Sequence, residues 1–302
     1  MIVNRDGGDS LFDAIRSLET QHGIEISVLV VDNASAASER ERLRAEAPKV
    51  RLVPLSRNLG FARAANEGIA RTRAPLILLL NNDARLAPDY VARLAARLAL
   101  DERLAAVQGV VLQADADRID TAGIEWTGRG EALPLFQRAS PSSLPGGVFE
   151  VSGISATAAL YRREALDSVG RGGRVFDDAF FAYYEDADLS LRLARGGWRF
   201  ACDPEAVARH EGSRTGRRTP FRRALWTARN RWRTLFRNFE PRTIRGSLGA
   251  LLRADLAHAR SLGWRGAALL LLTWPGVPIE ALRHRQESGR LSEWPPRAHD
   301  RR

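Results

Sequence analysis

A run of apolar residues that stops at polar side chains marks the first place in the chain where chemistry could occur. The leucines at 78–80 are followed directly by Asn81, Asn82 and Asp83. A short, bulky, uncharged run is typical of a strand buried on both faces, and open α/β sheets bind ligands beyond the carboxyl ends of their strands. Divalent cations prefer carboxylate oxygens. Our working hypothesis is that Asp83 holds a divalent cation against a nucleotide diphosphate.

Three other groups of polar side chains are of the types that binding and catalytic sites use. Asp32 and Asn33 follow another apolar run, an acidic group spans residues 185–188, and His210 stands further along the chain. A positioned carboxylate can accept a proton, and neighbouring carboxylates raise one another's pKa and hence their basicity. Each group also has a simpler interpretation. Asp32 and Asp83 could be helix caps or turn residues, the acidic group a first helical turn, and His210 a core or surface histidine.

Alternating strands and helices must position these side chains. Apolar runs predict strands at 24–31, 50–55, 75–80 and 105–112, and helical spacing predicts helices at about 10–22, after Gly60, and at 88–100. Strands that alternate with helices at this spacing imply right-handed βαβ units. The sequence thus predicts an α/β fold with a mostly parallel, doubly wound sheet, in which Asp32 and Asp83 each follow the carboxyl end of a strand.

The middle of the chain has a weaker pattern. Residues 113–147 combine Gly, Pro and Ser with scattered apolar residues, which predicts loop with short strands. The elements predicted after them are an ordered stretch at 148–161, a short helix around 163–169, a helix through 189–193 that ends at Gly196, and two short strands at 198–202 and 206–209. The second of these strands is expected to deliver His210.

The composition changes near residue 215. Residues 214–302 carry 20 arginines and six Asp or Glu, whereas the residues before them carry 26 basic and 30 acidic side chains. Arginine, leucine, alanine and tryptophan recur there at roughly helical spacing, which predicts a basic helical extension over 216–302. An excess of arginine in one segment suits an anionic partner.

The most apolar part of this extension favours a membrane surface as that partner. Residues 266–279 contain two prolines and are fewer than the about 20 apolar residues that span a bilayer. We therefore expect an interfacial helix or a hairpin in one leaflet. Arginines would lie at anionic head groups and tryptophans at the boundary, namely Trp226, Trp232, Trp264 and Trp274. Nucleic acid is the alternative partner of this arginine-rich segment. We rank it below lipid and do not expect it, because a phosphate-backbone binder does not require these apolar residues.

The start of the chain and its cysteine content suggest a compartment. Residues 1–6 lack the apolar stretch of a signal peptide, and Cys202 is the one cysteine. A single cysteine excludes an internal disulfide framework and suits a reducing environment. We expect a cytoplasmic protein, peripheral on the inner face of the cytoplasmic membrane.

Four pieces in a fixed order resemble a known family. They are Val31–Ser35, Asn58–Gly68, Asn81–Asp83, and Tyr184–Leu189 with His210 downstream. Together they resemble the family 2 glycosyltransferases with a GT-A fold, and most closely the rhamnosyltransferase-like branch. The resemblance covers residues 1–215, with a nucleotide-sugar half at about 1–112 and an acceptor or catalytic half at about 113–215. Residues 216–302 lie outside it.

The resemblance implies a role for each matching residue. Asp186 matches the catalytic base, with Glu185 beside it. Independently of the resemblance, residues 186 and 188 lie near a helix start and need not face the same way, so we expect Asp188 and Arg192 to be structural. Asp83 and His210 would hold Mn²⁺ or Mg²⁺. The residues expected to bind the nucleotide sugar are Asn4, Asp32, Asn58, Gly60, Arg63, Asn81 and Asn82. Arg214 and Arg217 are further candidates to reach the diphosphate, although they match no motif.

The resemblance also implies a reaction. An inverting enzyme would move a sugar, rhamnose as a first guess, from a dTDP- or UDP-sugar to a hydroxyl of a polyprenyl-linked or polysaccharide acceptor in cell-envelope glycan synthesis. The first strand departs from the family pattern, because residues 1–3 alone precede Asn4. The alternative is therefore a non-catalytic partner subunit that binds nucleotide sugar without transferring it.

Overall fold

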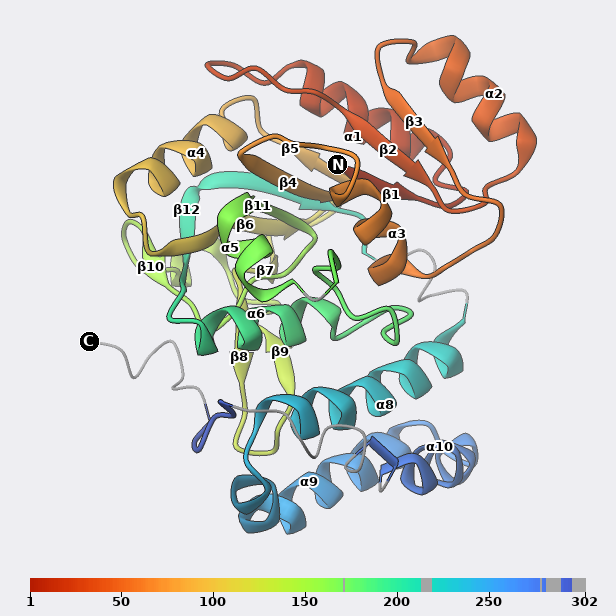
Figure 1. Cartoon of the computed structure of the whole chain (residues 1–302), viewed down its shortest axis with the longest axis vertical. Coiled ribbons are helices and arrows are strands. Elements are labelled where there is room, and N and C mark those ends of the chain that lie inside the picture. Colours follow the sequence, from red (N-terminus) through yellow and green to blue (C-terminus); the bar gives the residue numbers. More distant parts are fainter. Residues whose placement is uncertain (171, 213–218, 278, 281–288, 295–302) are drawn as a thin grey trace.

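A mixed β-sheet forms the centre of the protein (Figure 1). The computed structural model describes residues 1–170, 172–212, 219–277, 279–280 and 289–294. Within these residues the sheet has ten strands: β1 Ile2–Asn4, β2 Leu29–Asp32, β3 Arg51–Pro54, β4 Leu76–Asn81, β5 Ala84–Leu86, β6 Leu104–Gln113, β7 Ile119–Thr121, β10 Phe149–Glu150, β11 Ala158–Arg162 and β12 Arg199–His210. Eight lie in the order β10-β12-β6-β11-β4-β1-β2-β3, while β5 pairs with β12 and β7 with β6.

The first half of the chain forms the parallel part of this sheet. Strands β3, β2, β1 and β4 are parallel neighbours, and the helices between and after them are α1 Asp9–Glu19, α2 Ala37–Glu46, α3 Phe61–Ile69 and α4 Tyr90–Leu100. The predicted α/β fold is confirmed. The strand predicted at 24–31 begins only at Leu29, and α2 was not predicted. Helix α2 is highly charged and buries Leu43, so its sequence carries little amphipathic signal.

The second half of the chain adds antiparallel strands to the sheet, and one of them lies at a central position. Strand β11 lies between β4 and β6 and is antiparallel to both. Strand β12 is one continuous strand parallel to β6, with an irregular register between Asp203 and Val207. The prediction of two separate strands at 198–202 and 206–209 is therefore wrong, because a bulge bends the strand there without ending it.

The short elements predicted for the middle of the chain are present. Besides β7, residues 113–147 contain the hairpin of β8 Ile124–Trp126 and β9 Ala132–Pro134 and the 3₁₀ turn η1 Pro141–Ser143. The predicted helices are α5 Arg163–Val169 and α6 Glu185–Arg195, and α6 ends at Gly196 as expected.

Apolar residues fill both faces of the sheet. Val30, Leu78 and Leu80 belong to one hydrophobic cluster, whereas Val31, Ile77 and Leu79 belong to the other. Each fully buried side chain of this kind contributes about 1.5–3 kcal/mol of transfer free energy. The alternation within β2 and β4 confirms that these strands are buried on both faces, so their carboxyl ends are rigid points of attachment for the polar residues that follow.

The C-terminal residues form helices that pack below the sheet in Figure 1. They are α8 Pro220–Asn238, α9 Pro241–Ser261, α10 Arg265–Thr273 and the 3₁₀ turn η2 Trp274–Gly276. A third hydrophobic cluster joins Trp126 of the β8–β9 hairpin and Leu191 of α6 to Trp232, Leu235 and Leu251 of the C-terminal helices. Helices α8 and α9 therefore share a hydrophobic core with α6.

The tryptophans of this region do not all lie at a surface. Trp232 is buried, and its Nε1 donates to Asp255 Oδ2 at 2.8 Å, so its expected place at a membrane boundary is wrong. Trp264 is 81% exposed and Leu271 is 74% exposed. In the part of the chain that the structure describes, no helix combines the length and the apolar character needed to span a membrane.

Candidate active site

Asp83 and His210 meet at one edge of the sheet. Asp83 follows β4 by two residues, and His210 is the last residue of β12. His210 Nε2 lies 3.1 Å from Asp83 Oδ1, and both side chains are nearly buried. The two residues predicted to share a cation are thus brought together across 127 positions of sequence.

A second carboxylate orients the histidine ring. Asp120 Oδ2 lies 2.8 Å from His210 Nδ1, on the opposite side of the ring from Asp83. Burial lowers the pKa of His210, but the hydrogen bonds with Asp120 and Asp83 outweigh burial and raise that pKa to about 9. A carboxylate behind a histidine fixes which nitrogen faces the metal in many metalloproteins.

These residues fit a divalent cation as part of its coordination shell. One carboxylate oxygen and one imidazole nitrogen face each other, which is a donor set that Mn²⁺ accepts and Mg²⁺ accepts less readily. Among the described residues no group of three or more His, Cys, Asp and Glu side chains could hold a metal ion. Diphosphate oxygens would therefore have to supply further ligands.

The two asparagines before Asp83 point in different directions. Asn81 Nδ2 lies 3.5 Å from His210 Nε2, at the margin of a hydrogen bond. Asn82 Nδ2 donates to Asn4 Oδ1 at 2.7 Å. Asn4 is buried at the end of β1, and its amide donates to Glu39 Oε1 at 2.7 Å. Asn4 and Asn82 thus form a hydrogen-bonded link between the ends of β1 and β4.

The carboxylate of Asp32 is bound by neighbouring groups of the protein. Its side chain is 1% exposed, accepts from Ser35 N at 3.2 Å and lies 3.5 Å from Arg40 Nη1. These contacts stabilise the turn that leads from β2 into α2. The role of Asp32 in binding the nucleotide sugar stays a prediction.

The segment 58–60 is anchored to the end of β2 by Asn33. Asn33 Nδ2 donates to Asn58 Oδ1 at 2.9 Å and to Gly60 O at 3.1 Å, while its Oδ1 accepts from Leu59 N at 2.8 Å. Asn33 therefore fixes the loop that precedes α3. The sequence marked Asn33, together with Asp32, as a polar residue that follows an apolar run. It did not indicate that Asn33 contacts residues 58–60.

Gly60 is required for a close approach between two backbones. Its φ is 79°, and a Cβ atom there would lie 2.2 Å from the carbonyl oxygen of Phe181. Phe61 N donates to the same oxygen at 2.6 Å. Arg63 of α3 lies 3.7 Å from Asp178 Oδ2. The loop before α3 thus contacts the segment that leads into α6.

The predicted catalytic pair lies at the start of α6. Tyr183 and Tyr184 precede it with φ values of 69° and 70°, a left-handed conformation that is unfavourable for residues other than glycine. Asp186 Oδ2 accepts from Ala156 N at 3.3 Å, and its Oδ1 accepts from Ala187 N at 2.8 Å. Asp186 is therefore fixed by backbone N–H groups from two separate segments.

Burial raises the pKa of both carboxyl groups. Burial, together with the charge of Asp186, raises the pKa of Glu185 to about 8. Burial also raises the pKa of Asp186, although the N–H groups of Ala187 and Ala156 oppose the shift. Among the described residues Glu185 Oε2 has no hydrogen-bond partner. A raised pKa makes each carboxyl group a stronger base than an exposed carboxylate.

One short segment joins this pair to the sheet edge where Asp83 and His210 meet. Ala156 N donates to Asp186, and the next residue, Thr157, accepts at its carbonyl oxygen from Asn81 N at 2.8 Å. Consecutive Cα atoms are about 3.8 Å apart. Asp186 and the Asn81–Asp83 triplet therefore lie at the same end of the central sheet.

Asp188, for which we expected a structural role, is buried among ion-pair partners. It is 1% exposed, and its carboxylate contacts Arg192 Nε at 2.8 Å, Arg237 Nη1 at 3.3 Å and Asn238 Nδ2 at 2.9 Å. Burial raises the pKa of Asp188, but Arg192 and Arg237 outweigh burial and lower it. Asp188 is thus the centre of a buried ion-pair network that joins α6 to α8.

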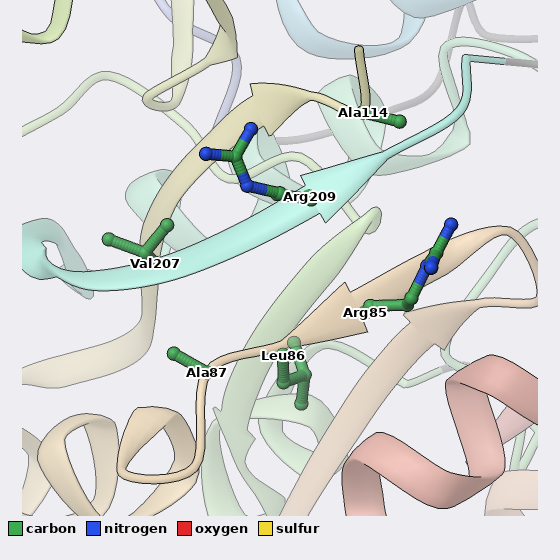
Figure 2. A pocket seen from close by; sticks show the side chains of 6 residues that line it. All are labelled: Arg85, Leu86, Ala87, Ala114, Val207 and Arg209. Carbon is green, nitrogen blue, oxygen red and sulfur yellow. The ribbon is translucent and has the colours of Figure 1, made fainter. Parts of the chain in front are cut away.

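A cavity of about 270 Å³ lies beside strands β5 and β12 (Figure 2). It is lined by Arg85, Leu86, Ala87, Ala114, Val207 and Arg209. Side chains alternate along a strand, so Arg209 and Val207 lie on the face of β12 opposite to His210. Arg85 is paired with Glu211 and Arg209 with Asp117. The residues that line this cavity therefore do not include Asp83, Asp186 or His210, which we predict to bind the cation or act as the base.

Sequence reasoning missed Asp120 and the residues of α8 that reach α6. Asp120 lies in the stretch without periodicity, and no local pattern separates it from Asp115 or Asp117. Arg214 and Arg217, predicted to reach the diphosphate, fall within 213–218, outside the described residues.

The family model described as "Glycosyl transferase family 2" matches residues 2–170, which is more than half of the 302 residues. The chain belongs to glycosyl transferase family 2. This glycosyltransferase is 28% identical over 234 residues to the N-acetylglucosaminyl-diphospho-decaprenol L-rhamnosyltransferase of Mycobacterium tuberculosis, across 68% of this chain and 73% of the relative. The predicted resemblance to the rhamnosyltransferase-like branch is confirmed.

Solved structures show the same fold. The mannosyltransferase PcManGT from Pyrobaculum calidifontis, in complex with GDP-Man and Mn²⁺, superposes with a TM-score of 0.58 at 19% identity, over 93% of this chain and 76% of that one. GalNAc-T7 with UDP, GalNAc and Mn²⁺ gives a TM-score of 0.57 at 14% identity, over 71% of this chain and 44% of that one. This family 2 glycosyltransferase therefore has the predicted GT-A fold.

Proposed function

We propose that this glycosyltransferase moves a sugar, with inversion, from a nucleoside-diphosphate sugar to an acceptor hydroxyl in cell-envelope glycan synthesis. The acceptor oxygen bonds to the anomeric carbon, the bond from that carbon to the diphosphate breaks, and the hydroxyl proton passes to a base. The observation that carries the proposal is the link through Ala156 and Thr157, which brings Asp186 and the Asn81–Asp83 triplet to one end of the sheet.

In this proposal Asp186 is the base. It is oriented by two N–H groups, and burial keeps its pKa above the usual range. Glu185, whose pKa is raised to about 8, would stay protonated near neutral pH and so leave Asp186 as the charged member of the pair. General-base catalysis of this kind is typically worth about 10²–10⁴ in rate.

Asp83 and His210 would hold Mn²⁺ or Mg²⁺, and Asp120 would orient the histidine. Such a cation, when bound, neutralises charge on the departing diphosphate. The loop at 58–60, with Arg63 and Asn81, would line the donor site beside it. This part of the proposal is supported by the facing Asp83 and His210 and by the Mn²⁺ in both structural neighbours. The nucleotide-sugar roles of Asn4, Asp32 and Asn82 remain predictions.

Release of nucleoside diphosphate from a panel of activated sugars tests the proposal. We expect turnover that depends on Mn²⁺ or Mg²⁺. Asp186→Asn should abolish turnover but leave donor binding intact, because the amide keeps the size of the side chain and loses its basicity. Equal turnover by wild type and Asp186→Asn would exclude Asp186 as the base.

The alternative is a partner subunit that binds nucleotide sugar without catalysis. Its main support was the short first strand, but β1 pairs in register with both β2 and β4. A folded full-length protein that binds donors and turns over none of them would favour this alternative.

The donor and acceptor follow the relatives. We propose dTDP-rhamnose as the donor, with UDP-sugars as the competing class, and a polyprenyl-diphosphate-linked or polysaccharide acceptor. Support comes from the Mycobacterium tuberculosis relative, an N-acetylglucosaminyl-diphospho-decaprenol L-rhamnosyltransferase. A thermal-shift screen of dTDP, UDP and GDP sugars with Mn²⁺ tests the donor, because a bound ligand stabilises in proportion to RT ln(1 + [L]/Kd).

We also propose that residues 216–302 form a basic extension that binds an anionic membrane on the cytoplasmic side. The exposed Trp264, with Arg265 Cζ 5.3 Å from its ring centroid, and the exposed Leu271 support this placement. Co-sedimentation with vesicles containing phosphatidylglycerol should exceed that with phosphatidylcholine, and Trp264→Ser with Leu271→Ser should reduce it. Stronger binding to DNA than to anionic vesicles would contradict the proposal. The boundary near residue 215 lies outside the described residues.

A further inference from the structure

The segment that leads into the catalytic pair has little internal support. Residues 175–184 contain no helix or strand and end in the two left-handed residues Tyr183 and Tyr184. Left-handed tyrosines persist only where surrounding contacts determine the backbone. Because Tyr184 is the N-cap of α6, the same contacts decide where Glu185 and Asp186 lie.

Helix α8 supplies those contacts through one residue in particular. Asn230 Nδ2 donates to the carbonyl oxygens of Ala182 at 2.9 Å and Tyr183 at 2.8 Å. Asn230 is 3% exposed, and its Oδ1 accepts from Arg233 Nη1 at 3.0 Å. Both N–H groups of this amide and its oxygen are therefore used, which fixes its orientation.

Two arginines on the same face of α8 contact the chain before and after residues 182–183. Arg233 Nη1 donates to Ala179 O at 2.6 Å. Arg237 Nη1 contacts Asp177 Oδ2 at 2.8 Å and Asp188 Oδ2 at 3.3 Å. Residues three and seven positions after Asn230 share its face of the helix. Helix α8 thus binds the segment at residues 177, 179, 182 and 183, while the carbonyl oxygen of Phe181 contacts Gly60 and Phe61 at the start of α3.

Helix α8 also contributes an aromatic contact to the segment. Trp226, one turn before Asn230 in α8, stacks on Phe181 with ring centroids 4.8 Å apart and on Tyr183 at 6.4 Å. These rings limit rotation of the peptides whose carbonyls Asn230 binds. Asn230 is the polar member of the contact, and it is the residue that acts directly on the left-handed pair.

We propose that Asn230 is a positioning residue for glycosyl transfer. By binding the carbonyls of Ala182 and Tyr183 it sets the start of α6, and it thereby places the carboxyl groups of Glu185 and Asp186 against the acceptor hydroxyl. The C-terminal helices are then part of the catalytic apparatus as well as a candidate membrane surface. The inference rests on the proposed role of Asp186 as the base.

Two substitutions separate hydrogen bonding from packing. Asn230→Ala removes the amide, whereas Asn230→Asp keeps its size and loses the two donated bonds. Arg229→Ala and Trp232→Phe are controls in the same helix. Arg229 is exposed and donates to Leu272 O, and Trp232 is buried and donates to Asp255. Neither control side chain has a hydrogen bond to residues 175–184 among those described.

The first measurement is hydrogen exchange of peptides covering residues 175–190, which does not depend on activity. In both Asn230 variants the backbone amides of residues 175–190 should exchange faster than in wild type, and exchange elsewhere should not change. In Trp232→Phe the faster exchange should lie mainly around α8 and α9. The second measurement is steady-state kinetics. Misplacing a catalytic group by about 1 Å can reduce the rate by about 10²-fold, so kcat should fall by about 10- to 100-fold with the KM for donor unchanged.

The pH profile separates a positioning role from a structural one. Looser packing exposes the carboxyl pair to water, so the acid limb of kcat should move to lower pH in both Asn230 variants and stay in place in both controls. Local exchange that does not change, or a wild-type kcat in Asn230→Asp, would overturn the inference. Inactive wild type would overturn the proposed function instead, and the exchange rates would still decide whether Asn230 holds the segment.

Discussion

Replacing Asp188 tests the buried network that joins α6 to α8. Its carboxylate is 1% exposed, and the side chains of Arg192 and Arg237 are each 6% exposed. Breaking a buried ion pair by removing one partner costs about 3–5 kcal/mol, because the other charge stays buried. Arg237 would keep Asp177, and Arg192 would keep the carbonyl oxygen of Val175.

We therefore expect Asp188→Asn to lower the free energy of unfolding by about 3 kcal/mol at pH 7, the lower end of the range for a broken buried pair. Urea denaturation followed by circular dichroism measures this change. Asp89→Asn is a matched control, because Asp89 and Arg93 form a helical pair with the same i,i+4 spacing but side chains that are 50% and 36% exposed. Exposed pairs contribute little, so this control should unfold as wild type does.

The pH dependence gives a second check on the same variant. Arg192 and Arg237 lower the pKa of Asp188 in the folded protein despite its burial. A carboxyl group with a lowered folded-state pKa stabilises the protein above its unfolded pKa of about 3.9, and this contribution is lost as pH falls through the folded-state value. The difference between wild type and Asp188→Asn should therefore shrink below about pH 4. An equal difference at pH 7 and at the lowest pH where both fold would refute the argument.

Three further substitutions test other parts of the site. Glu185→Gln should be more stable than wild type at pH 8 and equal at pH 4.5 in urea titrations, because a folded-state pKa raised from 4.5 to about 8 destabilises the protein progressively as pH rises across that interval. Asp120→Asn should weaken Mn²⁺ binding by about 10- to 100-fold in calorimetric titration, since it loses the carboxylate that orients His210; unchanged affinity would show that Asp120 is not needed. Gly60→Ala should lower the thermal midpoint and weaken donor binding, because a Cβ there would lie 2.2 Å from Phe181 O; a variant with wild-type donor affinity would contradict the link between these backbones.

The sequence predicted the features whose causes are local. Residues 78–80 alternate between two buried faces within five positions of Asp83, and the glycine at 196 ends α6 directly after the last helical residue. Patterns of this kind are determined by neighbours in the chain. For this reason the fold class, and the position of Asp83 beyond the carboxyl end of a strand, could be predicted from the sequence.

The sequence could not predict contacts made between distant segments. Asp120 and His210 are separated by 90 positions, and Asn230 lies 47 positions after Tyr183. An isolated aspartate in a loop or an asparagine in a helix has no spacing that marks its partner. The direction of β11 and the continuity of β12 were missed for the same reason, since pairing with β4 and β6 decides both.

The shared core of α6, α8 and α9 restricts how this protein can be recombined with its relatives. Exchanging residues after 215 to graft a different C-terminal part would leave Asp188 without Arg237 and Asn238, and it would remove the cover from Trp126 and Leu191. A chimera would keep the partners of Asp188 only if the incoming helix brought an arginine and an asparagine in the same register. The natural joint for domain exchange in this chain therefore does not coincide with the change in amino-acid composition.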